Sequence, residues 1–214
     1  AQMGHRVAVV ESRDVGGTCL NRGCMPTKAL LYAAELYAAA RGGAALGIQA
    51  EHLTYDFAAM HRRKNEVVAS LRQGVERLMK AGKVQVIRGA AQITGPGTVV
   101  CGGETYSAEN IIVATGSVPS CPPIPGRELP GVYTSDDLLE GEGKALSSLV
   151  IIGGGVIGVE CASIYLPLGC RVTIVEAMDH ILPQMDREIA QRLTMLLKQQ
   201  DAAVVDKASV QQIA

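Results

Sequence analysis

Apolar and polar residues alternate in two ways along this chain, in short apolar runs and in long stretches with helical spacing. Residues 6–10 form a short apolar run that ends at Glu11, and residues 25–41 are rich in Ala and Leu. Residues 57–81 repeat apolar positions at helical spacing and are followed by Gly82. These patterns predict a strand over 6–10 and helices over 25–41 and 57–81.

Further short apolar runs follow the second helix. They are residues 83–88, 91–94, 99–101 and 110–114, with Gly95-Pro96-Gly97 as a turn among them. This spacing predicts a small β meander beside a parallel sheet. Residues 119–131 then carry five prolines and two glycines, and a new strand–helix–strand pattern begins at Leu149. We therefore place a domain boundary near residue 119.

The composition narrows the class of protein. The 214 residues include 20 Lys+Arg and 21 Asp+Glu, which gives a formal net charge of −1 and no basic excess for nucleic acid. A hydrophobic content of 48% predicts a folded chain. Aromatic residues make up 3%, with no Trp, so an aromatic membrane belt is not expected. The composition indicates a globular α/β protein that binds neither nucleic acid nor membrane.

Two cysteines stand close together before the first predicted helix, Cys19 and Cys24. The positive end of a helix favours thiolate, and two thiols at this spacing can meet if the first turn is distorted, which favours a redox pair. One arm of a zinc site and two inert cysteines are the alternatives. The other four cysteines, which offer no comparable second arm, are Cys101, Cys121, Cys161 and Cys170.

The sequence Gly153-Gly154-Gly155-Val156-Ile157-Gly158 follows an apolar strand and precedes a helical segment. In this context G-x-G-x-x-G predicts a turn that brings backbone close to a pyrophosphate at a helix N-terminus. The next apolar strand, residues 171–175, ends at Glu176, where an acid can accept the ribose hydroxyls. The alternative is a glycine-rich turn in an ordinary strand–helix–strand unit.

Glu11 ends the first predicted strand as Glu176 ends the later one. We interpret it as the acid of an earlier dinucleotide unit whose glycine loop precedes Ala1, although a solvated strand end is the alternative. No initiator Met opens the chain, and the first strand has no earlier neighbour to pair with. We therefore expect the chain to be a fragment.

Three sequence segments together resemble the pyridine nucleotide-disulfide oxidoreductases, over essentially all 214 residues. They are Gly17-Thr18-Cys19-Leu20-Asn21-Arg22-Gly23-Cys24 with Pro26 and Lys28, then Ala114-Thr115-Gly116-Ser117, then residues 153–160. The resemblance implies an α/β fold of two Rossmann-like domains, both incomplete, with parallel sheet in three layers and a small β meander. Residues 1–118 would be part of an FAD-binding domain, 119–148 a linker, and 149–214 part of an NAD-binding domain.

The resemblance also implies catalytic roles. Cys19 would exchange with the substrate disulfide, and Cys24 would stack on the flavin as the charge-transfer thiolate. Lys28 would lie near the flavin and pair with Glu160, since a fixed cation stabilises arriving negative charge; a Lys on a solvated helix face is the alternative. Val156 resembles the gate that opens for nicotinamide.

The remaining implied contacts are to cofactors. FAD contacts would be Glu11, Gly17, Thr18, Lys28, Ala91, Thr115, Gly116 and Ser117, and NAD contacts would be Gly153, Gly155, Val156, Gly158, Glu176 and Ala208. Ala208 belongs to residues 207–210, which match a strand that flanks the adenine. No metal is expected.

Among the family, the chain is most similar to members that oxidise dihydrolipoamide with NAD. This implies a flavoprotein that is cytoplasmic, homodimeric when complete, and partnered with the lipoyl domain of a 2-oxo acid dehydrogenase complex. The family's catalytic His has no match in His5, His52, His61 or His180, which are interpreted as surface or packing residues. We therefore expect the 214 residues alone to be inactive. Mercuric or another disulfide reductase, and a non-catalytic nucleotide-binding module, are the alternatives.

Overall fold

The computed structural model describes residues 1–214 and contains two compact units. Unit 1 comprises residues 1–25 and 65–118, and unit 2 comprises residues 26–64 and 119–214. The assignment of 1–118, 119–148 and 149–214 to cofactor domains concerns ligands and stays a prediction.

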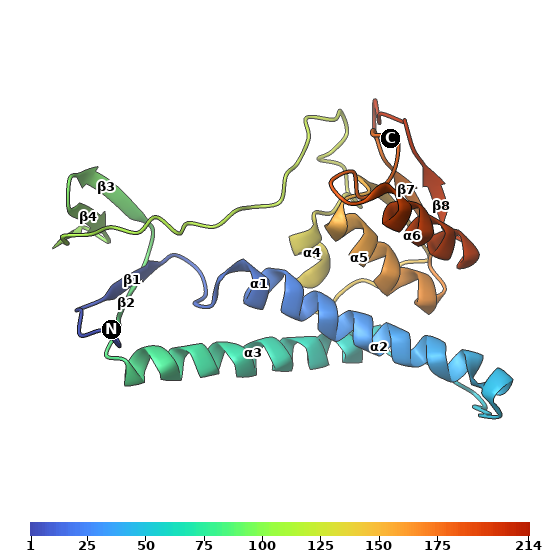
Figure 1. Cartoon of the computed structure of the whole chain (residues 1–214), viewed down its shortest axis with the longest axis horizontal. Coiled ribbons are helices and arrows are strands. Elements are labelled where there is room, and N and C mark those ends of the chain that lie inside the picture. The colour runs from blue at the N-terminus through green and yellow to red at the C-terminus, as the bar shows by residue number, and fades with distance from the viewer. The chain divides into compact units, whose positions relative to one another are not determined.

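The two long helices, α2 (Cys24–Gly42) and α3 (Phe57–Ala81), contribute residues to both units (Figure 1). The helix predicted over 57–81 has those bounds, and the helix predicted over 25–41 extends one residue further at each end. A 3₁₀ turn, η1 (Gly43–Leu46), follows α2. No helix is both long and apolar enough to span a membrane.

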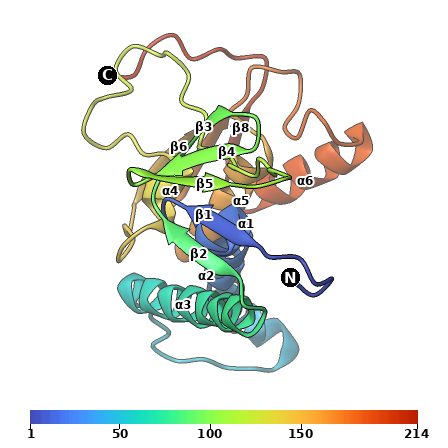
Figure 2. The ribbon, with the colours of Figure 1, turned by 90° about the vertical axis from the view of Figure 1, so that its left-hand side faces the viewer.

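Unit 1 contains two small sheets. Strand β1 (Ala8–Glu11) pairs in parallel with β2 (Gln85–Arg88). Strands β3 (Ala91–Gly95), β4 (Thr98–Cys101) and β5 (Glu104–Ser107) form an antiparallel meander (Figure 2). The predicted meander is confirmed. Strand β5 was not predicted from the sequence, because its residues, Glu, Thr, Tyr and Ser, are mostly polar and show no apolar alternation.

The strand predicted over residues 110–114 is wrong. These residues have no regular secondary structure, and the sheet formed by β1 and β2 has two strands. Ile112 is 89% exposed and Val113 is 67% exposed. An apolar run becomes a strand only where a neighbouring strand supplies ladder hydrogen bonds, and this segment has none beside it.

Unit 2 contains a parallel sheet of β6 (Ser148–Ile152), β7 (Arg171–Val175) and β8 (Ala203–Val205), in the order β6-β7-β8. Helix α5 (Val156–Tyr165) and the 3₁₀ turn η2 (Leu166–Leu168) connect the first two strands, and α6 (Arg187–Gln199) connects the last two. Parallel neighbours need such crossovers. The strand–helix–strand pattern predicted from Leu149 is therefore confirmed, as is the mixed α/β class.

Two helices of unit 2 were not predicted, α4 (Ser135–Leu139) and α6. Thr134 and Asp137 form a capping box at the start of α4, in which each side chain accepts a hydrogen bond from the other's backbone N–H. Asp186 caps α6, with its Oδ1 accepting from Glu188 N at 2.9 Å. Such caps satisfy orphan backbone donors and fix where each helix begins.

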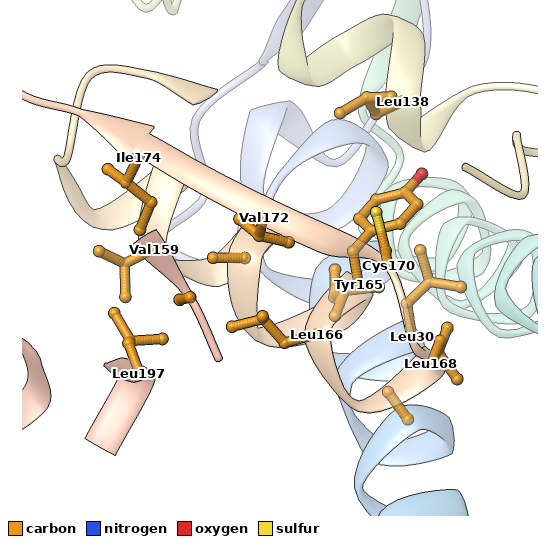
Figure 3. Packing of buried hydrophobic residues seen from close by; sticks show 14 of the residues in the cluster. Leu30, Leu138, Val159, Tyr165, Leu166, Leu168, Cys170, Val172, Ile174 and Leu197 are labelled. Carbon is orange, nitrogen blue, oxygen red and sulfur yellow. The ribbon is translucent and has the colours of Figure 1, made fainter. Parts of the chain in front are cut away.

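The core of unit 2 is one continuous apolar cluster (Figure 3). Its labelled members come from several elements: Leu30, Leu138, Val159, Tyr165, Leu166, Leu168, Cys170, Val172, Ile174 and Leu197. Val172 and Ile174 point from β7 onto α5, where Val159 and Tyr165 meet them. Burying each such side chain contributes about 1.5–3 kcal/mol. This packing fixes the turn between β6 and α5, where the glycine loop lies.

Candidate redox and nucleotide-binding sites

The two cysteines of the predicted redox pair are joined in a disulfide, with Cα atoms 4.7 Å apart. Cys19 lies in the short helix α1 (Gly17–Arg22), and Cys24 is the first residue of α2. Gly23 separates the helices with φ −133° and ψ −112°. A Cβ on Gly23 would lie 3.2 Å from Cys19 Cα, so glycine permits the close approach. The distorted turn that the spacing requires is therefore present, and the linkage is confirmed.

The position of Cys24 gives its sulfur an electrostatic advantage. A 19-residue helix starts at this residue, and the positive end of its dipole favours negative charge on the sulfur once the disulfide opens. Pro26, which is buried, falls in the first turn, where a missing backbone N–H costs no helix hydrogen bond. The local sequence thus builds a rigid helix start around this sulfur.

The other four cysteines are not linked: Cys101, Cys121, Cys161 and Cys170. Burial raises the pKa of Cys161 to about 11, and the Glu160 charge raises it further. Burial also raises the pKa of Cys170. Because thiolate is the reactive form, burial makes these two sulfurs less reactive than an ordinary cysteine. No group of three or more His, Cys, Asp or Glu side chains that could hold a metal ion is present.

Thr18 and Gly116, both proposed to contact FAD, lie close together within unit 1. A Cβ on Gly116 would lie 3.5 Å from Thr18 Oγ1, and Gly116 has φ +71°, which favours glycine. Thr115 and Ser117, beside Gly116 in the chain, are exposed, as is Gly17 beside Thr18. These residues are thus accessible to a ligand, which is compatible with the predicted cofactor, and their contacts to FAD stay predictions.

Glu11 and Ala91 are the other FAD residues of unit 1. Glu11 follows the last apolar residue of β1, and its Oε1 accepts a hydrogen bond from Arg13 N at 2.8 Å. Ala91 opens β3 and is exposed. Their predicted contacts to FAD stay predictions.

Lys28 and Glu160 form an ion pair within unit 2. Lys28 Nζ of α2 lies 3.5 Å from Glu160 Oε1 of α5, and the two side chains are 63% and 29% exposed. An exposed pair of this kind contributes about 0–1 kcal/mol to stability. The pair therefore contributes little to the stability of the fold, and its predicted role near the flavin stays a prediction.

The glycine loop has the geometry that its sequence predicts. Gly153 has φ +103°, which only glycine adopts readily, and so makes the tight turn after β6. Gly155 has open space around its Cβ position, which leaves its backbone accessible to a pyrophosphate. A Cβ on Gly158 would overlap the carbonyl oxygen of Gly153, so helix and strand meet there. The geometry of each glycine thus fits the purpose expected in a dinucleotide-binding loop, and the contacts to NAD stay predictions.

Val156 is the first residue of α5, directly after this loop, and is half exposed at 50%. A side chain at this position is free to change rotamer. Its predicted role as a gate stays a prediction.

The Glu176 side chain is buried, at 7% exposure, and held by the loop itself. Its Oε2 accepts a hydrogen bond from Gly154 N at 2.7 Å, and its Oε1 accepts one from Met178 N at 2.8 Å. Hydrogen bonds to a carboxylate are short and strong. The acid therefore stands at the glycine loop in one fixed orientation, at the end of β7.

The strand predicted over residues 207–210 is wrong, although Ala208 does lie beside β7. Strand β8 ends at Val205, and Lys207 has φ +53°, which breaks extended backbone. Ala208 N donates to Glu176 O at 3.0 Å, and Lys207 N donates to Met178 O at 2.8 Å. Ala208 thus approaches the acid through turn backbone. Its contact to NAD stays a prediction.

His61 and Lys64 on α3 are buried, so His61 is a packing residue, one of its two interpretations, whereas no local pattern indicated the burial of Lys64. Burial, with a smaller effect of the Lys64 charge, lowers the pKa of His61 to about 4. Burial also lowers the pKa of Lys64, whose Nζ donates to Leu139 O. The contact of Arg72, whose Nε donates to Asn21 between the two cysteines, was not predicted either, because no local pattern links residues 51 positions apart.

The fold and these sites define an α/β protein that carries a disulfide at a helix start and a dinucleotide-type glycine loop. The chain belongs to the pyridine nucleotide-disulphide oxidoreductase family, whose model matches residues 1–214.

Curated relatives and solved structures agree with this membership. The chain is 40% identical to the dihydrolipoyl dehydrogenase of Bacillus subtilis over 98% of this chain and 47% of that protein. It is 44% identical to dihydrolipoyl dehydrogenase 3 of Pseudomonas aeruginosa over 93% and 44% of the two chains. The HOCl-induced flavoprotein disulfide reductase RclA from Escherichia coli has a similar structure, with TM-score 0.82 and 35% identity over 99% and 46%. The chain thus spans about half the length of these relatives.

Proposed function

We propose that this chain belongs to a flavin-dependent disulfide oxidoreductase that oxidises dihydrolipoamide with NAD. The Cys19–Cys24 disulfide at the start of α2 is the observation that carries the proposal. Relatives named dihydrolipoyl dehydrogenase, about 40% identical, support the choice of substrate. The proposal includes a homodimer in the cytoplasm, with the lipoyl domain of a 2-oxo acid dehydrogenase complex as partner.

The disulfide would act by exchange. One sulfur of the substrate dithiol attacks Cys19 Sγ, which breaks the Cys19–Cys24 bond and leaves Cys24 as thiolate at the positive helix end. The second substrate sulfur then attacks the first and displaces Cys19. The substrate has lost two electrons and become a cyclic disulfide. The cysteines have gained them as one thiol and one thiolate, and one of the two substrate protons goes to solvent.

The remaining residues would bind and orient the cofactors. FAD, when bound, supplies the carrier that takes the electron pair from the dithiol to NAD. Thr18, Gly116 and Glu11 would hold FAD on unit 1. The Lys28–Glu160 pair, 3.5 Å apart, would place a fixed cation where negative charge develops.

NAD would lie on the glycine loop of unit 2. The backbone of Gly155 would approach the pyrophosphate, and the Glu176 carboxylate would accept the ribose hydroxyls. That carboxylate is held in place by two backbone N–H groups, and its negative charge would repel a 2′-phosphate. The site therefore favours NAD over NADP.

NAD-coupled turnover tests this function. With dihydrolipoamide and NAD, the FAD-loaded holoenzyme should form NADH, and Cys19→Ser and Cys24→Ser should each lower the rate by at least about a hundredfold, because exchange needs both sulfurs. Cys121→Ser is the matched control, since Cys121 is an exposed unlinked cysteine. NADH formation by Cys19→Ser at the unsubstituted rate would refute the exchange mechanism.

A reductase of another disulfide or oxidant is the second candidate. The structural similarity to an HOCl-induced flavoprotein disulfide reductase favours it, at TM-score 0.82. In the same holoenzyme, NADH consumption with other disulfides or mercuric ion, and no NADH from dihydrolipoamide, would select this candidate. Nucleotide binding with no turnover of any kind would select a non-catalytic module.

A further inference from the structure

A polar clamp joins the redox segment to helix α3 within unit 1. Asn21 lies in α1 between the two cysteines, and Arg72 lies in α3. Arg72 Nε donates to Asn21 Oδ1 at 2.9 Å, and an outer guanidinium nitrogen of Arg72 lies 3.2 Å from Asp14 Oδ2. We infer that Arg72 is a positioning residue that acts through Asn21 to hold the Cys19–Cys24 pair ready to close. The inference rests on the proposed function of this disulfide.

Asn21 closes the loop that leads into α1. Its Nδ2 donates to the carbonyl oxygens of Val15 and Gly17 at 3.0 Å each, and to Asp14 O at 3.3 Å. Because Arg72 has no acceptor, it selects the amide orientation in which Oδ1 faces α3 and Nδ2 faces the loop. The contact from Arg72 therefore favours the same amide orientation as the loop carbonyls do, and it strengthens the hold of Asn21 on the loop.

The loop and α1 need such a clamp. Gly16 and Gly17 have φ +110° and +74°, and the helix has no side-chain N-cap. Glycine loops lose much conformational freedom on folding, and a helix of six residues is not stable alone. When the disulfide is reduced, its covalent restraint on α1 disappears. The Asn21 contacts then remain to keep Cys19 near Cys24.

The clamp should therefore set the redox equilibrium of the pair. A small dithiol such as dithiothreitol reduces the disulfide to two thiols and is itself oxidised to its cyclic disulfide. Closing the protein ring again depends on the effective concentration of one cysteine near the other. Loss of the clamp lowers that concentration, so the equilibrium should move towards the dithiol by about tenfold, or about 30 mV for two electrons.

Charge and geometry can be separated by the choice of variant. The Arg72 guanidinium is already paired with Asp14, which reduces its field at the sulfurs. Arg72→Leu removes both the charge and the clamp. Arg72→Lys keeps the charge, but a single ammonium cannot reproduce the planar fork that reaches two partners. If Arg72 acts by position, both variants should shift the equilibrium towards the dithiol.

The experiment is a redox titration of the full chain in mixtures of reduced and oxidised dithiothreitol, with acid quench, alkylation and mass measurement of Cys19 and Cys24. Arg77→Leu is the matched control, because Arg77 lies on the same helix and donates to Gln73 in an exposed contact. We expect it to titrate as the unsubstituted chain does. In an Asn21→Ala background, Arg72→Leu should give no further shift, since its route of action is gone.

Several outcomes would overturn the inference. Identical titrations of the Arg72→Leu and unsubstituted chains would overturn it. A shifted Arg72→Leu together with an Arg72→Lys variant that titrates as the unsubstituted chain does would also overturn it, because that result indicates charge alone. A full shift from Arg72→Leu in the Asn21→Ala background would also do so. If Arg72→Leu does not fold, Asp14→Ala removes the second anchor of the guanidinium, and an unshifted titration of that variant overturns the inference. If the unsubstituted disulfide does not exchange with dithiols, the proposed function fails. If it does exchange and only the results expected for the variants are missing, the inference alone fails.

Discussion

Glu11 and Glu176 occupy the same local setting in two different units, yet their surroundings differ. Each follows the apolar run of a parallel strand, and each accepts a hydrogen bond at 2.8 Å from the backbone N–H two residues later, on Arg13 and Met178. Glu176 in addition accepts from Gly154 N of a glycine loop and is 7% exposed. Glu11 is half-buried.

The two units that carry these acids also differ in their buried residues. The continuous apolar cluster lies in unit 2, and it contains residues of α5, the helix that follows the glycine loop, and of β7, the strand that ends directly before Glu176. All four buried polar or charged residues also lie in unit 2: Thr27, His61, Lys64 and Glu176. A strand that ends in an acid is therefore a local pattern that recurs, whereas the glycine loop and the core around it determine how firmly the acid is held.

The largest expected effect concerns the glycine loop beside Glu176. Gly158→Ala should lower the free energy of unfolding by about 3 kcal/mol or more, because its Cβ would overlap the backbone of Gly153. Gly155→Ala should leave that free energy nearly unchanged, since its Cβ position is open, but should weaken NAD binding. Urea denaturation and NADH titration measure the two effects. Equal stability losses in both variants would remove the distinction between packing and ligand approach.

The second expected effect is a loss of stability in acid that originates in unit 2, where the buried His61 lies. The folded-state pKa of His61 is about 4, below its ordinary value of 6.5, so the native state keeps the ring neutral while the unfolded chain binds a proton. The stability from this neutral ring is complete above pH 6.5 and is lost as pH falls towards 4. The loss is about 2–3 kcal/mol, at 1.36 kcal/mol per pKa unit.

His61→Gln should abolish that part of the pH dependence, and His52→Gln, at an exposed site, should keep it. Urea midpoints at pH 7.5 and pH 4.5 provide the measurement. An unchanged pH slope in the His61→Gln variant would show that acid acts on unit 2 through other groups.

The smallest effect tests the two acids directly. Glu176→Ala should reduce the preference for NADH over NADPH by about ten- to a hundredfold, or about 1–3 kcal/mol, because the charge that repels a 2′-phosphate is gone. Glu11→Ala should leave the preference unchanged. The ratio of kcat/KM values for the two coenzymes in the holoenzyme measures this. A similar change in both variants would contradict the contrast between the acids.

Local patterns in the sequence predicted the elements that local physics determines. The helix over 57–81, the meander turn at Pro96-Gly97 and the glycine loop each depend on neighbouring residues, and each is present. The strand predicted over 110–114 is absent because a strand depends on a partner far away in the chain, and the strand predicted over 207–210 is absent because Lys207 has φ +53°, which the sequence pattern does not reveal. The same limit hid the clamp on Asn21, because Arg72 reaches it from another helix.

The ring closed by the disulfide is short, since its two cysteines are five positions apart. By the chain-entropy relation, a cross-link this short contributes about 2 kcal/mol to folding, against about 5 for a loop of roughly 100 residues. In the proposed function this bond opens and closes in each turnover, so the fold would gain and lose that stabilisation repeatedly. The close spacing of Cys19 and Cys24 would keep that change small, which favours a fold that persists when the disulfide is reduced.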